Sequence, residues 1–336
     1  MVKDLEYNVV CCTDDNYAEC CGVLLCSLLE NHKKKKFLIH ILSESLSDNV
    51  RSMIISLVHS YGSKVRFYDV DISKLEGVRF RKKNPLSMAA YYRILLSTTL
   101  DESIKKVLYL DCDIVIVGDI VPLFELDLTG YALAAVQDCV TIPSNDLHRL
   151  QLNFSYDDKY FNSGVLMLNL EYWRDNNIEP LMLDFAKRDR EVFYHDQDAL
   201  NYVFKRKWFQ LSPKWNRMNM VSIDSLTFNN RSDKREFIQD LRILHYASTQ
   251  AFKPWTEIKG IPYKKYYNKF KALTPWKDTP PLLVKGKAKV YGILLLYYIN
   301  NFILRAPYIF SIPFLILRDI AYFIHCCFKK VPYIKY

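Results

Sequence analysis

The sequence predicts an α/β fold with a mixed, mostly parallel β-sheet, and three observations carry this prediction. Short apolar segments alternate with segments of helical spacing through the first 110 residues. Hydrophobic residues make up 50% of the 336 residues, which is enough for one large domain, with or without an appendage. Aspartates follow predicted strands directly, and open α/β sheets bind ligands at the carboxyl ends of their strands.

The elements of the first third alternate regularly. Strands are predicted in YNVVCCTDD, FLIHIL, KVRFYDV and KVLYLD, because these short runs are rich in β-branched and aromatic residues. Helices are predicted at residues 17–32, 46–62 and 87–97, and Gly62 marks the end of the second. This order favours strands that run parallel, with helices covering both faces of the sheet.

Later segments continue the pattern less regularly. YALAAVQD and SGVLMLNL are predicted strands, PLMLDFAKRD and DQDALNYVF are predicted helices, and RILHYAS is the final predicted strand. Pro275, Pro280 and Pro281 then mark a linker. We therefore expect one domain over residues 1–274 and a separate segment over residues 275–336.

The C-terminal segment differs in charge and hydropathy from the rest. From Lys253 to the end the chain has fifteen Lys and Arg against three Asp and Glu, whereas the first 252 residues carry 31 basic and 34 acidic groups. Lys285, Lys287 and Lys289 precede fifteen uncharged residues, and no apolar run reaches the ~20 residues of a spanning helix. This pattern favours helices lying at an anionic membrane surface over a nucleic-acid partner. Buried core helices are one alternative, and a re-entrant or tilted hairpin through residues 290–317 is another.

Asp111 and Asp113 are the most informative pair of residues. They follow the apolar strand KVLYL, and residues two apart in a strand point to the same side. Two carboxylates can thus bind one hard cation, Mg²⁺ or Mn²⁺, that in turn holds substrate phosphates. Solvated or helix-capping aspartates at a strand end are the alternative reading of the spacing alone.

Six motifs in order extend the argument: TDDNYAEC (13–20), AAYYRILL (89–96), LYLDCDIVI (108–116), YFNSGVLMLNL (160–170), HDQDALN (195–201) and HYASTQAFKPW (245–255). Together they resemble glycosyltransferase family 8, the retaining nucleotide-sugar transferases that include bacterial lipopolysaccharide galactosyl- and glucosyltransferases and glycogenin. The resemblance covers roughly residues 7–255. It implies a nucleotide-sugar transferase (GT-A-like) fold, a catalytic domain at 1–274, and transfer of galactose or glucose from a UDP-sugar to a glycan or glycolipid acceptor.

The resemblance also implies roles for individual residues. Asp111, Asp113 and His245 match the metal ligands, and the histidine favours Mn²⁺ over Mg²⁺. The residues matching the donor site are Thr13, Asp14, Asn16, Tyr17, Arg93, Asp111, Cys112, Asp113, Asp138, Asn162 and Lys253. Gln197 and Asp196 match the groups near the reacting sugar, although an amide is a poor nucleophile and attack from the front face needs none. The family usually has a glycine shortly after the histidine that matches His245, and this sequence lacks it. The backbone can then approach the phosphate differently, which bears most on the predicted role of Lys253.

The same residues bear on alternative protein classes and on the cellular location of the protein. A haloacid-dehalogenase-like phosphatase also places two aspartates after a strand, but nearer the N-terminus and with a later acidic cluster. Nucleotidyltransferases need a glycine-rich phosphate loop, and no such loop occurs. A catalytically inactive membrane-bound scaffold is the third alternative. Nine scattered cysteines and a charged N-terminus predict a cytoplasmic protein with reduced thiols, bound peripherally to the cytosolic membrane face.

Overall fold

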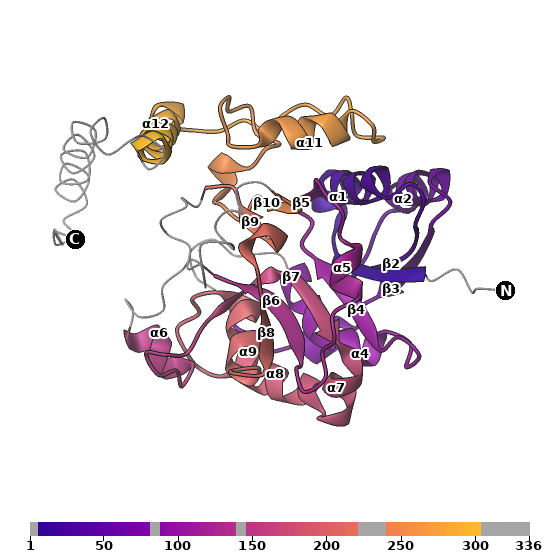
Figure 1. Ribbon diagram of the computed structural model, residues 1–336, viewed down its shortest axis with the longest axis vertical. Coiled ribbons are helices and arrows are strands. Elements are labelled where there is room, and N and C mark those ends of the chain that lie inside the picture. The colour runs from indigo at the N-terminus through magenta and orange to yellow at the C-terminus, as the bar shows by residue number, and fades with distance from the viewer. Residues whose placement is uncertain (1–5, 81–87, 139–145, 221–239, 304–336) are drawn as a thin grey trace.

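The computed structural model (Figure 1) describes residues 6–80, 88–138, 146–220 and 240–303. Its main sheet has seven strands in the order β3-β2-β1-β4-β7-β6-β8. Strands β1, β2, β3 and β4 run parallel, β7 runs antiparallel to both β4 and β6, and β8 runs parallel to β6. The strands are Glu6–Cys12, Lys36–Ser43, Lys64–Asp69, Lys106–Leu110, Leu133–Gln137, Phe161–Asn169 and Trp208–Leu211 for β1, β2, β3, β4, β6, β7 and β8.

A second, three-stranded sheet lies at the end of β4 and has the order β5-β10-β9. Strand β10 (Ile243–His245) pairs antiparallel with β5 (Ile114–Ile116) and parallel with β9 (Arg217–Met218). The small sheet therefore brings a late segment of the chain against the residues that follow β4, which positions the candidate site.

Helices cover both faces of the main sheet (Figure 1). They are α1 Ala18–Asn31, α2 Asp48–Ser60, α3 Ala89–Tyr92, α4 Leu96–Thr99, α5 Val121–Phe124, α6 Asp146–Gln151, α7 Leu170–Asp175, α8 Ile178–Lys187, α9 His195–Val203, α11 Lys264–Lys271 and α12 Lys287–Ile303. Helices α1 and α2 lie on one face of the main sheet, and α4, α7, α8 and α9 on the other.

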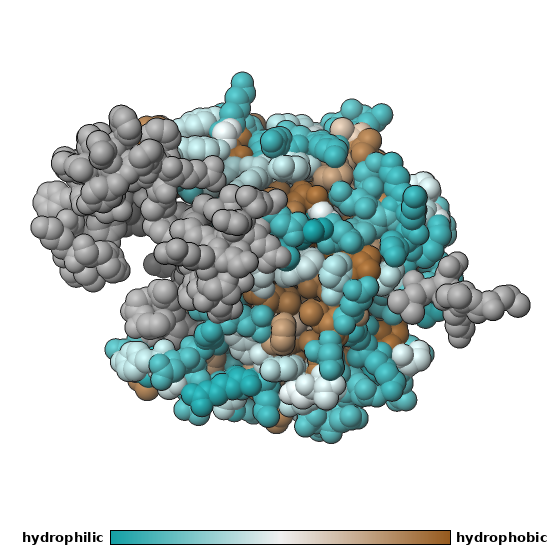
Figure 2. Space-filling model, viewed as in Figure 1, coloured by the Kyte–Doolittle hydropathy of each residue, from teal (hydrophilic) through white to brown (hydrophobic). Residues whose placement is uncertain are grey.

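Alternation along the strands divides the core into two clusters. Val9 and Cys11 of β1 join the cluster beneath α1 and α2, whereas Val10 and Cys12 join the cluster beneath α4, α7, α8 and α9. This is the side-chain period of two that a strand with two buried faces requires. On the face shown in Figure 2, hydrophilic residues cover most of the described surface, and hydrophobic residues show mainly between them near its middle.

The predicted helix at residues 87–97 is interrupted. The structure has α3, then a 3₁₀ turn at Arg93–Leu95, then α4. A 3₁₀ turn winds more tightly than an α-helix, and such turns inside helical segments often mark functional positions. Here the turn carries Arg93, whose guanidinium reaches into the candidate site.

The described part of the C-terminal segment consists of a short extended stretch and α12. Leu282 forms an isolated bridge with Thr256, and Val290 and Leu294 of α12 pack against Phe252, Ile258 and Ile261. Among the described residues, we find no helix with both the length and the apolar character needed to cross a bilayer. The later apolar runs of the tail lie outside the described residues.

Candidate active site

Asp111 and Asp113 directly follow strand β4, as the sequence predicts, but they lie in a turn between β4 and β5 that the sequence did not predict. The backbone N–H of Asp111 donates to the Gly164 carbonyl (2.9 Å), and the N–H of Tyr246 donates to the Asp113 carbonyl (2.9 Å). Strand β7 and the end of β10 thus hold this turn from two sides. The backbone that carries the two carboxylates is therefore fixed by hydrogen bonds to segments more than fifty residues away.

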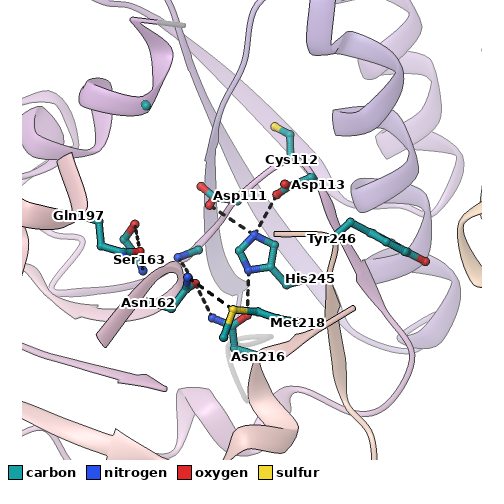
Figure 3. A network of polar contacts seen from close by, with 12 residues as sticks. Asp111, Cys112, Asp113, Asn162, Ser163, Gln197, Asn216, Met218, His245 and Tyr246 are labelled. Atoms are coloured by element: carbon teal, nitrogen blue, oxygen red, sulfur yellow. Dashed lines mark hydrogen bonds and ion pairs between the residues drawn. The ribbon is translucent and has the colours of Figure 1, made fainter. Parts of the chain in front are cut away.

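His245 faces both carboxylates, as Figure 3 shows. Its Nε2 atom lies 3.1 Å from Asp113 Oδ1 and 3.8 Å from Asp111 Oδ2. One ligand atom from each residue lies within 4.8 Å of the other two. Two carboxylate oxygens and an imidazole nitrogen form a donor set that suits Mn²⁺ or Mg²⁺, so the three predicted ligands fit a divalent cation.

A chain of amide hydrogen bonds fixes the tautomer of His245. The Gly164 N–H donates to Asn162 Oδ1 (3.0 Å), so this atom is an acceptor, and Asn216 Nδ2 donates to it as well (2.8 Å). Asn216 must then turn its Oδ1 toward His245 Nδ1 (2.9 Å), which donates. His245 Nε2 is therefore the ring nitrogen that faces the carboxylates and is available to a cation, the arrangement in which a neighbouring group orients a metal-ligating histidine.

Gly164 makes room for this histidine. A β-carbon at position 164 would lie 2.3 Å from His245 Cε1 and 2.9 Å from Asp111 Oδ2. Neither atom belongs to a flexible chain end that could move aside freely. Any side chain at position 164 would thus displace the imidazole or the carboxylate.

The second oxygen of Asp111 is held by two other residues. Its Oδ1 accepts from Arg93 Nη2 (2.8 Å) and from the Tyr109 hydroxyl (2.8 Å), and the Arg93 guanidinium lies 4.3 Å from the centre of the Tyr109 ring. Arg93 Nη1 also donates to the Ser163 carbonyl (2.8 Å). Asp111 is therefore oriented with Oδ2 toward His245, while Arg93 supplies a buried positive charge beside it.

Lys253 supplies the second positive charge of the site. It forms an ion pair with Asp113 Oδ2 and donates to the Tyr246 carbonyl (2.7 Å). Burial alone would raise the pKa of Asp113, but Lys253 and His245 hold it well below its usual range. The Asp113 carboxylate is thus ionised at any physiological pH, as a metal ligand must be.

A cavity of about 780 Å³ opens beside these residues. It is within the size range of small-molecule sites. Eight of the predicted donor-site residues line it: Thr13, Asp14, Tyr17, Arg93, Asp111, Cys112, Asp113 and Lys253. Tyr109 and residues 248–251, from the loop before Lys253, complete much of the wall.

The remaining predicted residues lie elsewhere. Asn16 is exposed on the 3₁₀ turn after β1 and is not part of the cavity wall. Asp138, Asn162 and Gln197 form a buried network in which Asp138 Oδ2 accepts from Asn162 Nδ2 (2.9 Å) and Gln197 Nε2 (3.1 Å). Gln197 Oε1 accepts from the Ser163 N–H (2.9 Å). Asn162 also accepts from Asn216, which in turn contacts His245. The network is therefore connected to the three candidate metal ligands.

Asp196 lies on the other side of Arg93. Its Oδ2 is 3.0 Å from Arg93 Nε, but that N–H donates to the Ala90 carbonyl (3.0 Å), so the contact with Asp196 is ionic. Burial raises the pKa of Asp196 to about 7, although Arg93 opposes the shift. Asp196 is 3% exposed and is not part of the cavity wall.

Sequence reasoning missed several residues of the site. Asn216 orients His245, Tyr109 orients Asp111, and Gly164 leaves space between them. Asp198 is a fully buried hub that accepts from His148 Nε2 (2.7 Å) and the Tyr160 hydroxyl (2.9 Å), and it anchors helix α9. Only the second acidic position of HDQD gave a sequence signal for this hub, because two of its partners, His148 and Tyr160, lie 50 and 38 residues away in the sequence.

Comparison with known proteins agrees with this geometry. A family model described as glycosyl transferase family 8 matches residues 8–259. The chain is 30% identical over 285 residues to the general stress protein A of Bacillus subtilis (strain 168), which covers 82% of this chain and 96% of that protein. It is 27% identical over 277 residues to a lipopolysaccharide 1,2-glucosyltransferase of Escherichia coli, covering 82% of this chain and 80% of that one.

A solved structure gives the same answer for the fold. The galactosyltransferase LgtC, in complex with donor and acceptor sugar analogues, superposes with a TM-score of 0.70 at 25% identity, covering 80% of this chain and 96% of that chain. This likeness confirms the predicted GT-A-like fold, and none of these matches supports the phosphatase or scaffold alternatives. From its sequence and its fold together, the chain belongs to glycosyl transferase family 8.

Proposed function

We propose that this protein is a metal-dependent retaining hexosyltransferase. It moves galactose or glucose from a UDP-sugar to a lipopolysaccharide or another surface glycan. The observation that carries the proposal is the convergence of Asp111, Asp113 and His245, with the histidine nitrogen turned toward the carboxylates by Asn216. The similarity to a lipopolysaccharide glucosyltransferase and a galactosyltransferase supports the choice of sugar and acceptor class.

The residues around the cavity suit a nucleoside diphosphate. Asp111, Asp113 and His245 would hold Mn²⁺, with Mg²⁺ as the alternative, and the bound cation would neutralise charge on the departing diphosphate. Lys253 lies at the same edge and can exchange its ion pair with Asp113 for one with a phosphate oxygen. Tyr17 and Asp14 line the same cavity and offer a ring and a carboxylate for the uracil base.

Arg93 and the buried polar network would position the sugar. Arg93 bridges Asp111 and Asp196 beside the proposed metal ligands, so its fixed charge would lie near the junction of the sugar and the diphosphate. Gln197 and Asp196 are not part of the donor cavity wall, and this favours front-face attack. In that route the departing phosphate oxygen takes the proton of the acceptor hydroxyl, and no protein nucleophile is needed.

The C-terminal segment, residues 275–336, would hold the enzyme at the cytosolic face of an anionic membrane. Three lysines precede or begin α12, and Leu283, Leu295 and Tyr298 are 78%, 61% and 48% exposed. Exposed apolar and aromatic side chains beside lysines suit the interface of a bilayer with anionic headgroups. The acceptor, as a glycolipid, would meet the enzyme at that surface.

The decisive experiment is UDP release from a panel of UDP-sugars, with and without Mn²⁺. We expect slow Mn²⁺-dependent hydrolysis of one UDP-hexose by the wild type and a loss of at least ~100-fold in Asp113→Asn, because a ligand and its charge are removed. Asp175→Asn, at an exposed position of α7, is the matched control and should retain activity. If no sugar releases UDP and Mn²⁺ does not promote UDP binding, the proposal fails.

A further inference from the structure

A second group of potential metal ligands lies behind the donor cavity. Cys11 of β1, Cys21 of α1 and Cys112, between the two aspartates, bring their sulfur atoms within 4.8 Å of one another. The Sγ atoms of Cys11 and Cys21 are 3.7 Å apart. These three thiols come from three separate elements, and their proximity is a product of the tertiary fold.

The spacing of the sulfurs suits a thiophilic cation. Zn–S bonds are about 2.3 Å long, so two thiolates at the corners of a zinc tetrahedron lie about 3.8 Å apart. The Cys11–Cys21 pair already has this separation, and Cys112 needs only a small movement to join it. The Cys12 carbonyl, which accepts from Cys112 Sγ (3.2 Å), lies beside the group and could serve as an oxygen ligand.

Burial and charge narrow the class of cation. Cys11 and Cys21 are fully buried and Cys112 is 7% exposed. Thiolates select soft cations such as Zn²⁺ and Cu⁺ over Mg²⁺ or Mn²⁺. Three thiolates around Zn²⁺ leave a net charge of about −1, whereas Cu⁺ would leave about −2, and burial penalises the larger charge.

The thiol group is chemically and spatially distinct from the predicted manganese ligands. In Figure 3 the Cys112 side chain points away from His245, toward the opposite side of the turn that carries Asp111 and Asp113. One turn therefore presents hard oxygen ligands on one side and a soft sulfur ligand on the other. We propose that Cys11, Cys21 and Cys112 form a Zn²⁺ site that ties β1 and α1 to the turn bearing the two aspartates.

Cd²⁺ is the probe for this site, because cadmium thiolates have a charge-transfer absorption in the ultraviolet that carboxylate and imidazole ligands lack. We expect the reduced protein to bind one Cd²⁺ with this band, and Zn²⁺ to displace it. Cys11→Ser and Cys21→Ser should each lose the band. Cys26→Ser, a buried α1 cysteine outside the group, is the matched control and should keep it.

Two further variants separate this site from its alternatives. The band should persist in Asp113→Asn and in excess Mn²⁺. The test of the zinc site is therefore independent of the proposed transferase activity. A Cys326→Ser/Cys327→Ser background excludes thiols of the tail. The proposal is overturned if no thiolate band forms, or if it survives in both Cys11→Ser and Cys21→Ser; the three cysteines would then act as small apolar core residues. Should one serine variant fold poorly, the other still decides.

Discussion

At the scale of single residues, the site depends on orientation as much as on ligand identity. Asp111, Asp113 and His245 could each rotate, but hydrogen bonds restrict all three side chains. Asp111 accepts from Arg93 and Tyr109, Asp113 accepts from Lys253, and His245 donates to Asn216. Partners of this kind fix the direction of a lone pair before a cation arrives. The consequence is that residues without any contact to a metal should influence its affinity.

Asn216→Ala tests the orientation of His245. The variant removes the acceptor of the Nδ1 proton, so the imidazole can take the other tautomer or rotate away. We expect Mn²⁺ affinity to fall by about 10–100-fold, the usual effect of losing such a partner. Isothermal calorimetry measures the affinity, with exposed Asn176→Ala as control. An unchanged Mn²⁺ dissociation constant would contradict the assigned role of Asn216.

Asp196→Asn tests the buried carboxyl beside Arg93. The pKa of Asp196 is raised from 3.8 to about 7. Between these values the folded state binds the proton that the unfolded state has released, so stability decreases as pH rises from about 4 to 7. The loss is on the order of a few kcal/mol.

Thermal unfolding across this pH range provides the measurement. The melting temperature of the wild type should fall from pH 5 to pH 8 by more than that of Asp196→Asn, which has no proton to lose at this position. Parallel curves for the two proteins would show that Asp196 titrates near its ordinary value.

At the scale of elements, helix α12 supports the loop that carries Lys253. Val290 and Leu294 pack on Phe252, Ile258 and Ile261, and Glu257 forms an ion pair with Lys287. Leu282 also exchanges backbone hydrogen bonds with Trp255 and Glu257. The segment proposed to bind the membrane is therefore in direct contact with one wall of the donor cavity.

A pair of adjacent leucines separates the two roles of α12. Leu294 is 4% exposed and Leu295 is 61% exposed. Leu294→Ala should loosen the contact with the Lys253 loop, at a local cost of about 2–5 kcal/mol, and weaken UDP binding. Leu295→Ala should leave UDP binding unchanged and weaken vesicle binding. Calorimetry with UDP and vesicle sedimentation measure the two effects, and equal UDP affinities in both variants would refute the support role.

At the scale of the whole molecule, charge and fold are distributed unevenly. The main sheet places β1 beside β4 in the middle, and both strands deliver polar residues to the same edge. All the positive excess lies after residue 252, where the sequence has fifteen basic and three acidic residues. The proposed catalytic and membrane-binding roles thus belong to different parts of the chain.

This charge distribution predicts salt-sensitive membrane binding. Basic residues near an anionic surface contribute about 1 kcal/mol each, and salt screens this attraction. Sedimentation with phosphatidylserine-containing vesicles should decrease steeply between 50 and ~500 mM salt, where the screening length falls well below ~10 Å. Vesicles of neutral lipid serve as control. Equal binding to neutral and anionic vesicles would mean that apolar contact alone holds the protein.

The sequence by itself determined the fold class and most of the residues that meet around one cavity. Strand–helix alternation gave the main sheet, and the strand-end positions of Thr13, Asp14, Asp111 and Asp113 placed them at one edge, because parallel strands end together. The motif order supplied His245 and Lys253. A pattern of apolar and polar residues reflects local periodicity. The strands, the helices and the strand-end positions of these residues are local features of this kind.

Only the tertiary structure decided how the site is held together. The hydrogen bonds that orient His245 and Asp111 join Asn216, Asn162 and Arg93 across 18 to 54 positions of sequence. The meeting of Cys11, Cys21 and Cys112 and the packing of α12 on the Lys253 loop are likewise long-range contacts. Such contacts depend on where β4, β7 and β10 lie in space, and no local periodicity encodes that placement.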